Sequence, residues 1–334
     1  MKHLCMTSEA HIRGGAIWDG YFHGLRTGVL DIETTGLNPR RDRCILGGLY
    51  DVQTGVLHQV FAESTSEEEE TLQVFARLMD EVDMVVTYNG RHFDMPFLAE
   101  RMGRAGTEAK ALPYDLDLYR MVQGYSPIRR FLPNLKQKSV ENYMGLWQDR
   151  TDEISGAESV ELYYEYMATK DPALEEKILL HNRDDVEQLT RLTKVMDKCD
   201  VHRAMNRMGF PVLLEGGCLQ VNRVQLGRDQ LTAEGEQGRL ALDYRCYELE
   251  GYPAQASFSR SSGSFRIDLP LIRRSGMAVV DLRAAGLAEE DFARYPAGGS
   301  GFLVLQEGDE IRYREINHFV RAFLQRLAPD GGTR

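Results

Sequence analysis

The sequence has few cysteines, no long apolar run and, after Lys198, no lysine. Its five cysteines are dispersed and include no C-x-x-C pair, so we expect reduced thiols, neither zinc ligands nor a disulfide framework. No apolar stretch reaches about 18 residues, which excludes a transmembrane helix. The first residues lack the apolar middle of a signal peptide, so the expected location is cytoplasmic, with no membrane association.

Charge divides the chain in two. Residues 201–334 carry 17 basic and 17 acidic residues, so the whole net charge of −11 lies in the first 200 residues. This change, with a length of 334 residues, predicts two domains with a boundary near residue 200. An acidic chain repels polyanions, so a nucleic-acid role would need divalent metal ions or local basic patches.

The two halves also differ in their hydrophobic patterns. Apolar runs predict strands early in the chain, and helical spacing follows them, most clearly at 174–198. Period-two alternation at 239–248 and 264–269 predicts antiparallel strands, before a helix at 315–327. We expect an α/β domain with a mixed sheet flanked by helices, then a smaller β-rich domain with a C-terminal helix. The expected bounds are an N-terminal extension at 1–25 and domains at 26–200 and 201–334.

Acidic residues stand out at three places in the first domain. Asp31 and Glu33 are two apart on a predicted strand, so both side chains leave the same face. Two neighbouring carboxylates repel unless a proton or a cation lies between them, and hard divalent cations prefer oxygen ligands. Asp94 follows a strand and an Asn-Gly turn, and His181 and Asp185 share one face of the long helix. Taken singly, these residues also fit solvated acids, a helix cap and a surface ion pair.

Together, in this order, the segments resemble known motifs. LDIETTG, YNGRHFDMPFL and HNRDDVEQL resemble the three motifs of the DEDD (DnaQ-like) 3′–5′ exonuclease superfamily, which has the ribonuclease-H-like fold. The segments LPNLK and SVENYMG resemble a further stretch between the second and third motifs, and this combination of motifs is closest to the bacterial YprB-like group. The resemblance covers about residues 26–200 and leaves the β-rich domain without a family.

The resemblance implies a hydrolase that cleaves phosphodiester bonds with two divalent cations, Mg²⁺ or Mn²⁺. Asp31, Glu33, Asp94 and Asp185 would be the metal ligands, with Asp184 as the alternative to Asp185. His181 would orient or deprotonate the attacking water, although it lies four residues before Asp185, which is the spacing of the family's tyrosine branch. Its role therefore stays open between base and orienting residue.

The resemblance also implies a pocket for the terminal nucleotide of a single-stranded DNA or RNA 3′ end. Its residues are expected to be Thr34, Thr35, Leu37, Asn89 and Phe93. For Leu37 and Phe93, packing in the core is an equal alternative. The basic residues Arg129, Arg130, Lys136 and Lys138 fit either phosphate contacts or a solvated loop. Asp115 and Asp117 form a second acidic pair, for which we expect a structural role.

Two other functions remain open at this stage: a non-catalytic nucleic-acid-binding protein on the same fold, and a structure-specific endonuclease. In the second domain, arginines alternate with aromatic residues, from Arg239 and Tyr244 to Phe265 and Arg266. Such a sheet face binds single strands by stacking, but the same alternation also packs a half-buried sheet. The sequence gives no indication of protein partners or of the oligomeric state.

Overall fold

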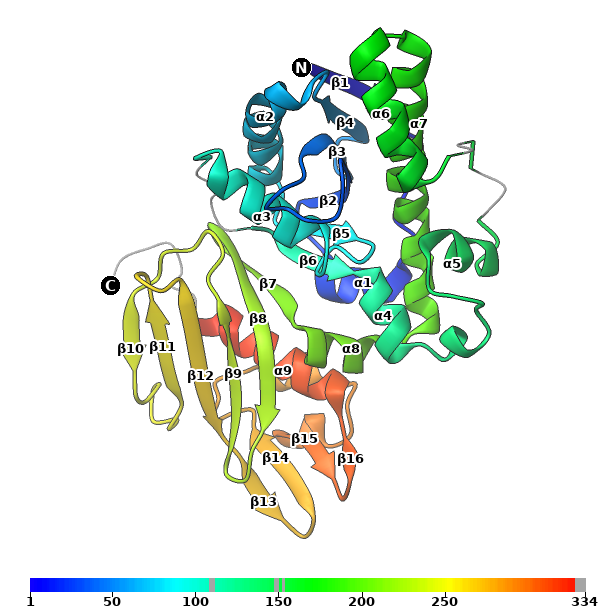
Figure 1. The fold of residues 1–334 in the computed structure, drawn as a ribbon. Coiled ribbons are helices and arrows are strands. Elements are labelled where there is room, and N and C mark those ends of the chain that lie inside the picture. Colours follow the sequence, from blue (N-terminus) through cyan, green and yellow to red (C-terminus); the bar gives the residue numbers. More distant parts are fainter. Residues whose placement is uncertain (108–111, 147–149, 152–153, 328–334) are drawn as a thin grey trace. The chain divides into compact units, whose positions relative to one another are not determined.

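A computed structural model describes residues 1–107, 112–146, 150–151 and 154–327 (Figure 1). The chain divides into two compact units, Met1–Cys199 and Asp200–Arg334. Residues 1–25, expected as an extension, contribute strand β1 (Lys2–Thr7) and helix α1 (Gly15–Phe22) to the first unit. Within the described ranges, no helix is long and apolar enough to cross a membrane.

The first unit is built on a mixed sheet with the strand order β1-β4-β3-β2-β5-β6. Its strands after β1 are β2 (Thr27–Thr34), β3 (Cys44–Asp51), β4 (Val56–Phe61), β5 (Met84–Thr87) and β6 (Tyr114–Asp117). The neighbours β1 and β4, β4 and β3, and β3 and β2 pair antiparallel. The neighbours β2 and β5, and β5 and β6, pair parallel. The predicted strands and the mixed α/β class are therefore confirmed for this unit.

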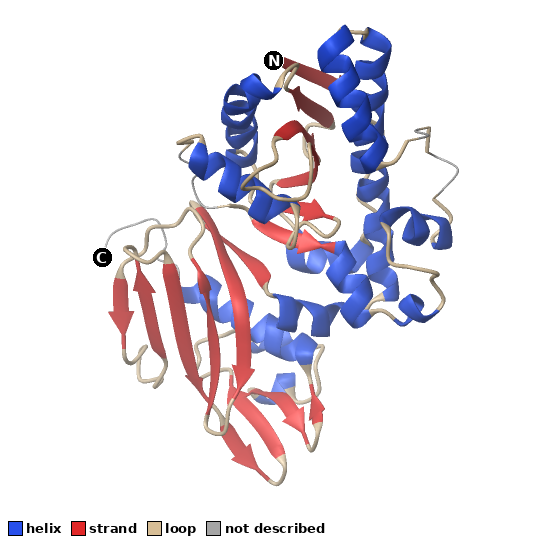
Figure 2. Cartoon of the chain, in the orientation of Figure 1, coloured by secondary structure: helices blue, strands red, loops and turns tan. Residues whose placement is uncertain are grey.

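Helices flank this sheet (Figure 2). They are α2 (Glu68–Asp80), α3 (Asp94–Arg104), α4 (Leu118–Tyr125), α5 (Gln137–Tyr143), α6 (Gly156–Thr169) and α7 (Pro172–Leu192), with short 3₁₀ helices at Thr65–Glu67, Pro127–Arg130 and Thr193–Lys198. Phe75 of α2 and Val60 of β4 belong to one apolar cluster, which also includes residues of α3. Phe61 and Ile178 belong to a second cluster, under α6 and α7. The sheet is thus covered on both faces, as its nearly continuous apolar strands require.

The helix α7 begins sharply for a local reason. The Asp171 carboxylate accepts the backbone N–H of Ala173 at 2.9 Å, and Pro172 occupies the first turn, where its missing N–H costs nothing. The helix then runs for 21 residues and contacts β2, β3, β4 and β5. It therefore brings its middle turn, from His181 to Asp185, across the sheet.

The second unit contains antiparallel strands and two helices, α8 (Val201–Met208) and α9 (Tyr313–Leu327). One sheet has the order β10-β11-β12-β9-β8-β7, and a smaller sheet has the order β13-β14-β15-β16. The strands are β7 (Phe210–Leu214), β8 (Gly217–Leu226), β9 (Gln230–Glu236), β10 (Tyr244–Cys246), β11 (Gln255–Ser259), β12 (Ser264–Pro270), β13 (Ile272–Arg274), β14 (Met277–Asp281), β15 (Phe302–Glu307) and β16 (Glu310–Ile311). Short 3₁₀ helices lie at Glu289–Phe292 and Gly298–Ser300. The predicted β-rich region with a C-terminal helix is confirmed.

The expected strand at 239–248 is wrong over most of its length, because only Tyr244–Cys246 pairs with a neighbour. The buried side chain of Gln237 holds the start of this segment instead. Its amide group donates to the carbonyl of Leu242 at 3.0 Å and accepts the N–H of Leu242 at 2.8 Å. The Gln237 side chain thus takes the place of some of the backbone hydrogen bonds that the period-two alternation predicts for a strand.

Candidate active site

Three segments that are far apart in the sequence meet at one cavity in the first unit. The cavity has a volume of about 760 Å³. Asp31 and Glu33 line it from β2, and His181 and Asp185 line it from α7. Asp94 is not among the residues that line the cavity, but at the start of α3 its Oδ1 accepts the backbone N–H of Ile32, between Asp31 and Glu33, at 3.3 Å. The expected face of β2 and the expected turn of the long helix therefore come together.

Asp31 is held by a chain of amide side chains. Asn182 of α7 donates to Asp31 Oδ2 at 3.0 Å and to the Asp31 carbonyl at 3.2 Å, and Gln59 of β4 donates to Asn182 Oδ1 at 3.0 Å. Asp31, Gly48 and Gln59 stand side by side across β2, β3 and β4. Gly48 matters here because a Cβ at that position would collide with the Asn182 amide. The glycine therefore lets α7 approach the sheet closely enough to fix Asp31.

Electrostatics sets these carboxylates apart from ordinary surface acids. Burial raises the pKa of Asp31 well above its usual range, and the charges of Asp185, Asp94 and Glu33 raise that pKa further. The hydrogen bond from Asn182 opposes this shift. Burial also raises the pKa of Asp94 to about 8, with smaller contributions from the neighbouring Asp115 and Asp117. The cluster is thus costly when it is fully ionised and metal-free, since like charges share a low-dielectric site.

The imidazole of His181 lies between two carboxylates. His181 Nε2 is 3.8 Å from Glu33 Oε1 and 3.6 Å from Asp185 Oδ2. Both distances exceed those of a good hydrogen bond, which leaves space for a small ligand among the three groups. Glu33 and His181 are only 6% and 4% exposed, so these two side chains are largely shielded from bulk solvent.

Arg150, which no motif of the sequence predicts as a site residue, contacts Asp185 through its Oδ1. Arg150 donates to Asp185 Oδ1 at 2.5 Å and to both carboxylate oxygens of Glu141, which is completely buried. Burial lowers the pKa of Arg150, but its hydrogen bond to Glu141 and the charge of Asp185 outweigh that effect, so the net pKa is raised. Because Arg150 holds Oδ1, the other oxygen of Asp185 is the one that faces His181.

The minor alternative, Asp184, has a different role in this structure. Its Oδ2 accepts the backbone N–H of Thr151 at 2.6 Å and the Thr151 hydroxyl at 2.9 Å. Only Asp185 of the two lines the cavity, together with Glu33 and His181. Adjacent residues of a helix point in different directions, so Asp185 faces the cavity whereas Asp184 binds the backbone at Thr151.

The expected substrate residues fall into two groups. Thr34, Thr35, Leu37 and Phe93 line the cavity. Leu37 is 82% exposed, so the alternative that it packs in the core is wrong. Phe93 is half-buried, contacts the apolar cluster under α3 and also lines the cavity, so it packs against the core while its contact with substrate stays a prediction.

Asn89 is absent from the residues that line the described cavity. It adopts a left-handed turn with φ of 66°, and its backbone N–H donates to Asp117 Oδ1 at 2.9 Å. Among the basic candidates, Lys136 and Lys138 line the cavity, whereas Arg129 and Arg130 do not. The cavity therefore has an acidic wall from β2 and α7 and a basic edge at the start of α5.

The donor chemistry of the cluster fits a divalent cation. One ligand atom each from Glu33, His181 and Asp185 lies within 4.8 Å of the others. Carboxylate oxygens are the ligands that Mg²⁺ and Mn²⁺ prefer, and a cation would neutralise the repulsion that raises the pKa of Asp31. The sequence patterns did not predict the roles of Asn182 and Arg150, which hold Asp31 and Asp185, or of Gln59, which holds Asn182. The only available signal was that Asn182 directly follows His181.

The fold and the site together define the class of this unit: an α/β domain with a cluster of carboxylates at one cavity. Within that class, the chain belongs to the RNase H superfamily, whose family model matches residues 29–197, half of the chain. No curated protein matches the sequence. Among solved structures, the family B DNA polymerase from the hyperthermophilic archaeon Pyrobaculum calidifontis is 17% identical, with a TM-score of 0.44 over 90% of this chain and 46% of that chain. The chain thus spans less than half of that polymerase.

Proposed function

We propose that this protein is a metal-dependent 3′–5′ exonuclease of the DEDD type that hydrolyses phosphodiester bonds of DNA or RNA. The observation that carries the proposal is the convergence of Asp31, Glu33, Asp94 and Asp185 from β2, α3 and α7. The charges of Asp185, Asp94 and Glu33 all raise the pKa of Asp31, so the four carboxylates lie near enough to one another to interact. Membership of the RNase H superfamily supports a nuclease, and the order of the motifs supports the finer class.

Asp31, Glu33 and Asp185 would hold one divalent cation, and Asp94 would reach a second. Bound Mg²⁺ or Mn²⁺ would supply Lewis-acid stabilisation of the phosphate and a lowered pKa of the attacking water. The protein contributes rigidity to this arrangement. Asn182 restrains Asp31, and Arg150 restrains Asp185 with Oδ2 toward His181.

His181 would take the proton of the attacking water at Nε2. This atom faces the Glu33 and Asp185 carboxylates, so it borders the space where the water must lie. An unperturbed imidazole has a pKa near neutrality, which suits proton transfer at cellular pH. The short helical spacing between His181 and Asp185 keeps base and metal ligand in one turn.

The walls of the cavity suit the end of a single strand. Leu37 presents an exposed apolar side chain at the rim, and Phe93 presents an aromatic one, so together they offer a base an apolar surface. Lys136 and Lys138 border the same cavity and provide positive charge for a phosphate. A terminal nucleotide in this cavity would therefore have apolar side chains beside its base, lysines near a phosphate and the carboxylates of β2 and α7 nearby.

The test is the product ladder from 5′-labelled single-stranded DNA and RNA oligonucleotides, with Mg²⁺, with Mn²⁺ and in EDTA. An exonuclease of this polarity shortens the strand stepwise from the 3′ end, and only with metal. A circular single strand should stay intact, because it has no end. Cleavage of the circle would indicate an endonuclease, and binding without any cleavage would indicate a non-catalytic binding protein. Equal cleavage in EDTA would reject the proposed metal dependence.

A further inference from the structure

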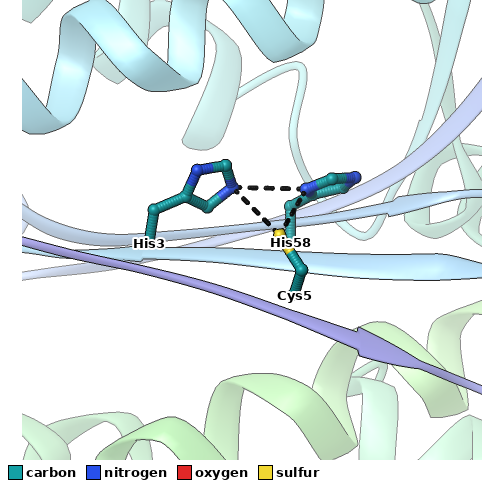
Figure 3. A group of neighbouring side chains, drawn as sticks. All are labelled: His3, Cys5 and His58. Carbon is teal, nitrogen blue, oxygen red and sulfur yellow. Dashed lines mark hydrogen bonds between the residues drawn. The ribbon is translucent and has the colours of Figure 1, made fainter.

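A second group of metal-binding side chains lies at the edge of the six-stranded sheet, outside the cavity described above. His3 and Cys5 belong to β1, and His58 belongs to β4, where it stands directly opposite Cys5 (Figure 3). Residues two apart on a strand project from one face, so His3 and Cys5 lie on the same side as His58. His3 and Cys5 are exposed and His58 is half-buried, so the group is accessible from solvent.

The three donor atoms form a nearly equilateral triangle. His3 Nε2 is 3.2 Å from His58 Nδ1, and Cys5 Sγ is 3.6 Å from His3 Nε2 and 3.4 Å from His58 Nδ1. With Zn–N near 2.0–2.1 Å and Zn–S near 2.3 Å, a tetrahedral zinc centre requires N···N of about 3.3 Å and N···S of about 3.6 Å. The observed triangle therefore has the dimensions of one face of a zinc tetrahedron.

Hydrogen bonds alone satisfy this triangle poorly. A hydrogen bond is strong only when its hydrogen points along the line to the acceptor, and one hydrogen cannot point at two corners of a triangle. Neutral imidazoles and a thiol would thus make at least one of the three contacts strongly bent and weak. A cation near the centre receives a lone pair from all three atoms at once.

We propose that His3, Cys5 and His58 bind one Zn²⁺ ion in a tetrahedral site whose fourth position is taken by water. Thiolate and imidazole ligands favour Zn²⁺ over Mg²⁺ and Mn²⁺, so this site and the carboxylate cavity select different ions. The proposal does not depend on nuclease activity. It revises the expectation from the sequence that the cysteines are not zinc ligands, because strand pairing rather than a C-x-x-C motif assembles the site.

The ion would link the edge strand β1 to the body of the sheet. An edge strand has a ladder partner on one side only, here β4, so a cross-strand link restrains it more than it would restrain a central strand. Binding should therefore protect the β1 backbone from local opening. This gives the proposal a structural readout in addition to metal affinity.

Cobalt is the probe for the first experiment, because Co²⁺ occupies tetrahedral zinc sites and a thiolate–cobalt bond absorbs in the near ultraviolet. Untagged full-length protein is titrated with Co²⁺ in excess Mg²⁺, which occupies carboxylate sites. We expect the thiolate band to saturate at one equivalent and to disappear when Zn²⁺ is added. Absence of the band from the wild-type protein would overturn the proposal.

Variants then assign the ligands. Cys5→Ser should abolish the thiolate band, and His3→Gln or His58→Gln should weaken Co²⁺ binding at least about tenfold, since loss of even an outer partner of a metal site costs this much. Cys246→Ser and His23→Gln are the matched controls and should bind as the wild type does. A band that persists in Cys5→Ser would contradict the assignment.

Hydrogen exchange provides the second measurement. Zn²⁺ should slow amide exchange in peptides that cover Lys2–Thr7 several-fold in the wild type, and should have no such effect in Cys5→Ser. Equal exchange with and without Zn²⁺ in the wild type would reject the link between β1 and β4.

Discussion

Asp31 with Glu33 on β2 and Asp115 with Asp117 on β6 share one local pattern, two acids separated by one residue on a strand. Both strands are parallel neighbours of β5. Their surroundings nevertheless differ. Asp117 accepts backbone N–H groups from Asn89, Arg91 and Arg120, and Asp115 accepts the Thr87 hydroxyl at 2.6 Å. The β6 pair thus holds local structure, in agreement with the expected structural role.

The β2 pair instead faces other carboxylates. Asp31 has Asn182 as a hydrogen-bond donor, but its nearest charges are those of Asp185, Asp94 and Glu33, all of the same sign. A structural acid gains stability from donors around it, whereas a metal ligand keeps like charges together until a cation arrives. The two acidic pairs have the same local sequence pattern, so their different roles depend on the groups that surround each pair in the folded protein.

The largest expected effect concerns activity at the β2 pair. Asp31→Asn should abolish metal-dependent cleavage, because it removes a proposed metal ligand whose charge interacts with those of Asp185, Asp94 and Glu33. It should also stabilise the metal-free protein by relieving repulsion. Product ladders and thermal melts with and without Mg²⁺ check both results. If Asp31→Asn lowered the melting temperature of the metal-free protein as much as Asp117→Asn does, the proposed difference between the acidic pairs of β2 and β6 would be wrong.

His181 gives the next effect in size. His181→Ala should reduce the cleavage rate by about 10²–10⁴, the usual contribution of a general base, and should change the pH–rate profile. His92→Ala, which alters an exposed histidine near the same domain's Asn-Gly turn, is the control. An unchanged rate in His181→Ala would mean that this imidazole only packs between the two carboxylates.

A change on β6 should affect stability rather than chemistry. Asp117→Asn replaces a buried carboxylate that accepts three backbone N–H groups, and it should cost about 1–3 kcal/mol in the free energy of unfolding. Denaturant unfolding measures this loss, and the rate per folded molecule should stay within a few-fold of the wild type. Wild-type stability together with loss of cleavage would show that the β6 pair belongs to the catalytic site.

The smallest effect is the pH dependence due to Asp115. Burial raises the pKa of Asp115 to about 7, opposed by the hydrogen bond from Thr87. The folded protein then holds a proton that the unfolded chain releases near pH 4, so this contribution to stability is present at low pH and is lost as the pH rises through about 7. Asp115→Asn should flatten that slope, with a difference of about 1–2 kcal/mol between pH 6 and pH 9. If the free energy of unfolding changed with pH equally in the variant and the wild type, the raised pKa of Asp115 would be contradicted.

The second unit offers a related lesson about patterns. The aromatic residues, for which the sequence allowed either base stacking or sheet packing, stack on one another, since Phe258 lies against both Tyr244 and Phe265. Phe258 and Phe265 are each 3% exposed, and Arg266 forms ion pairs with Glu234 and Asp268. These aromatic rings therefore pack the sheet, as the alternative interpretation had it. A nucleic-acid-binding role of this unit remains a prediction without support from them.

The sequence determined most of the first unit. Apolar runs, an Asn-Gly turn and a long helical period are local signals, so the strands from β2 to β5 and the helices α3 and α7 could be predicted near their observed bounds. The spacing Asp31-x-Glu33 and the turn from His181 to Asp185 likewise predicted which side chains share a face, since both depend only on the geometry of one element.

Tertiary structure decided what surrounds those side chains. Gly48 admits Asn182 to Asp31, Arg150 takes one oxygen of Asp185, and the pairing of β1 with β4 gathers His3, Cys5 and His58. None of these contacts leaves a local period or motif, because each joins residues that are distant in the chain. Burial and neighbouring charge arise only when the chain is folded, and they distinguish a carboxylate that supports the backbone from one that we propose as a metal ligand.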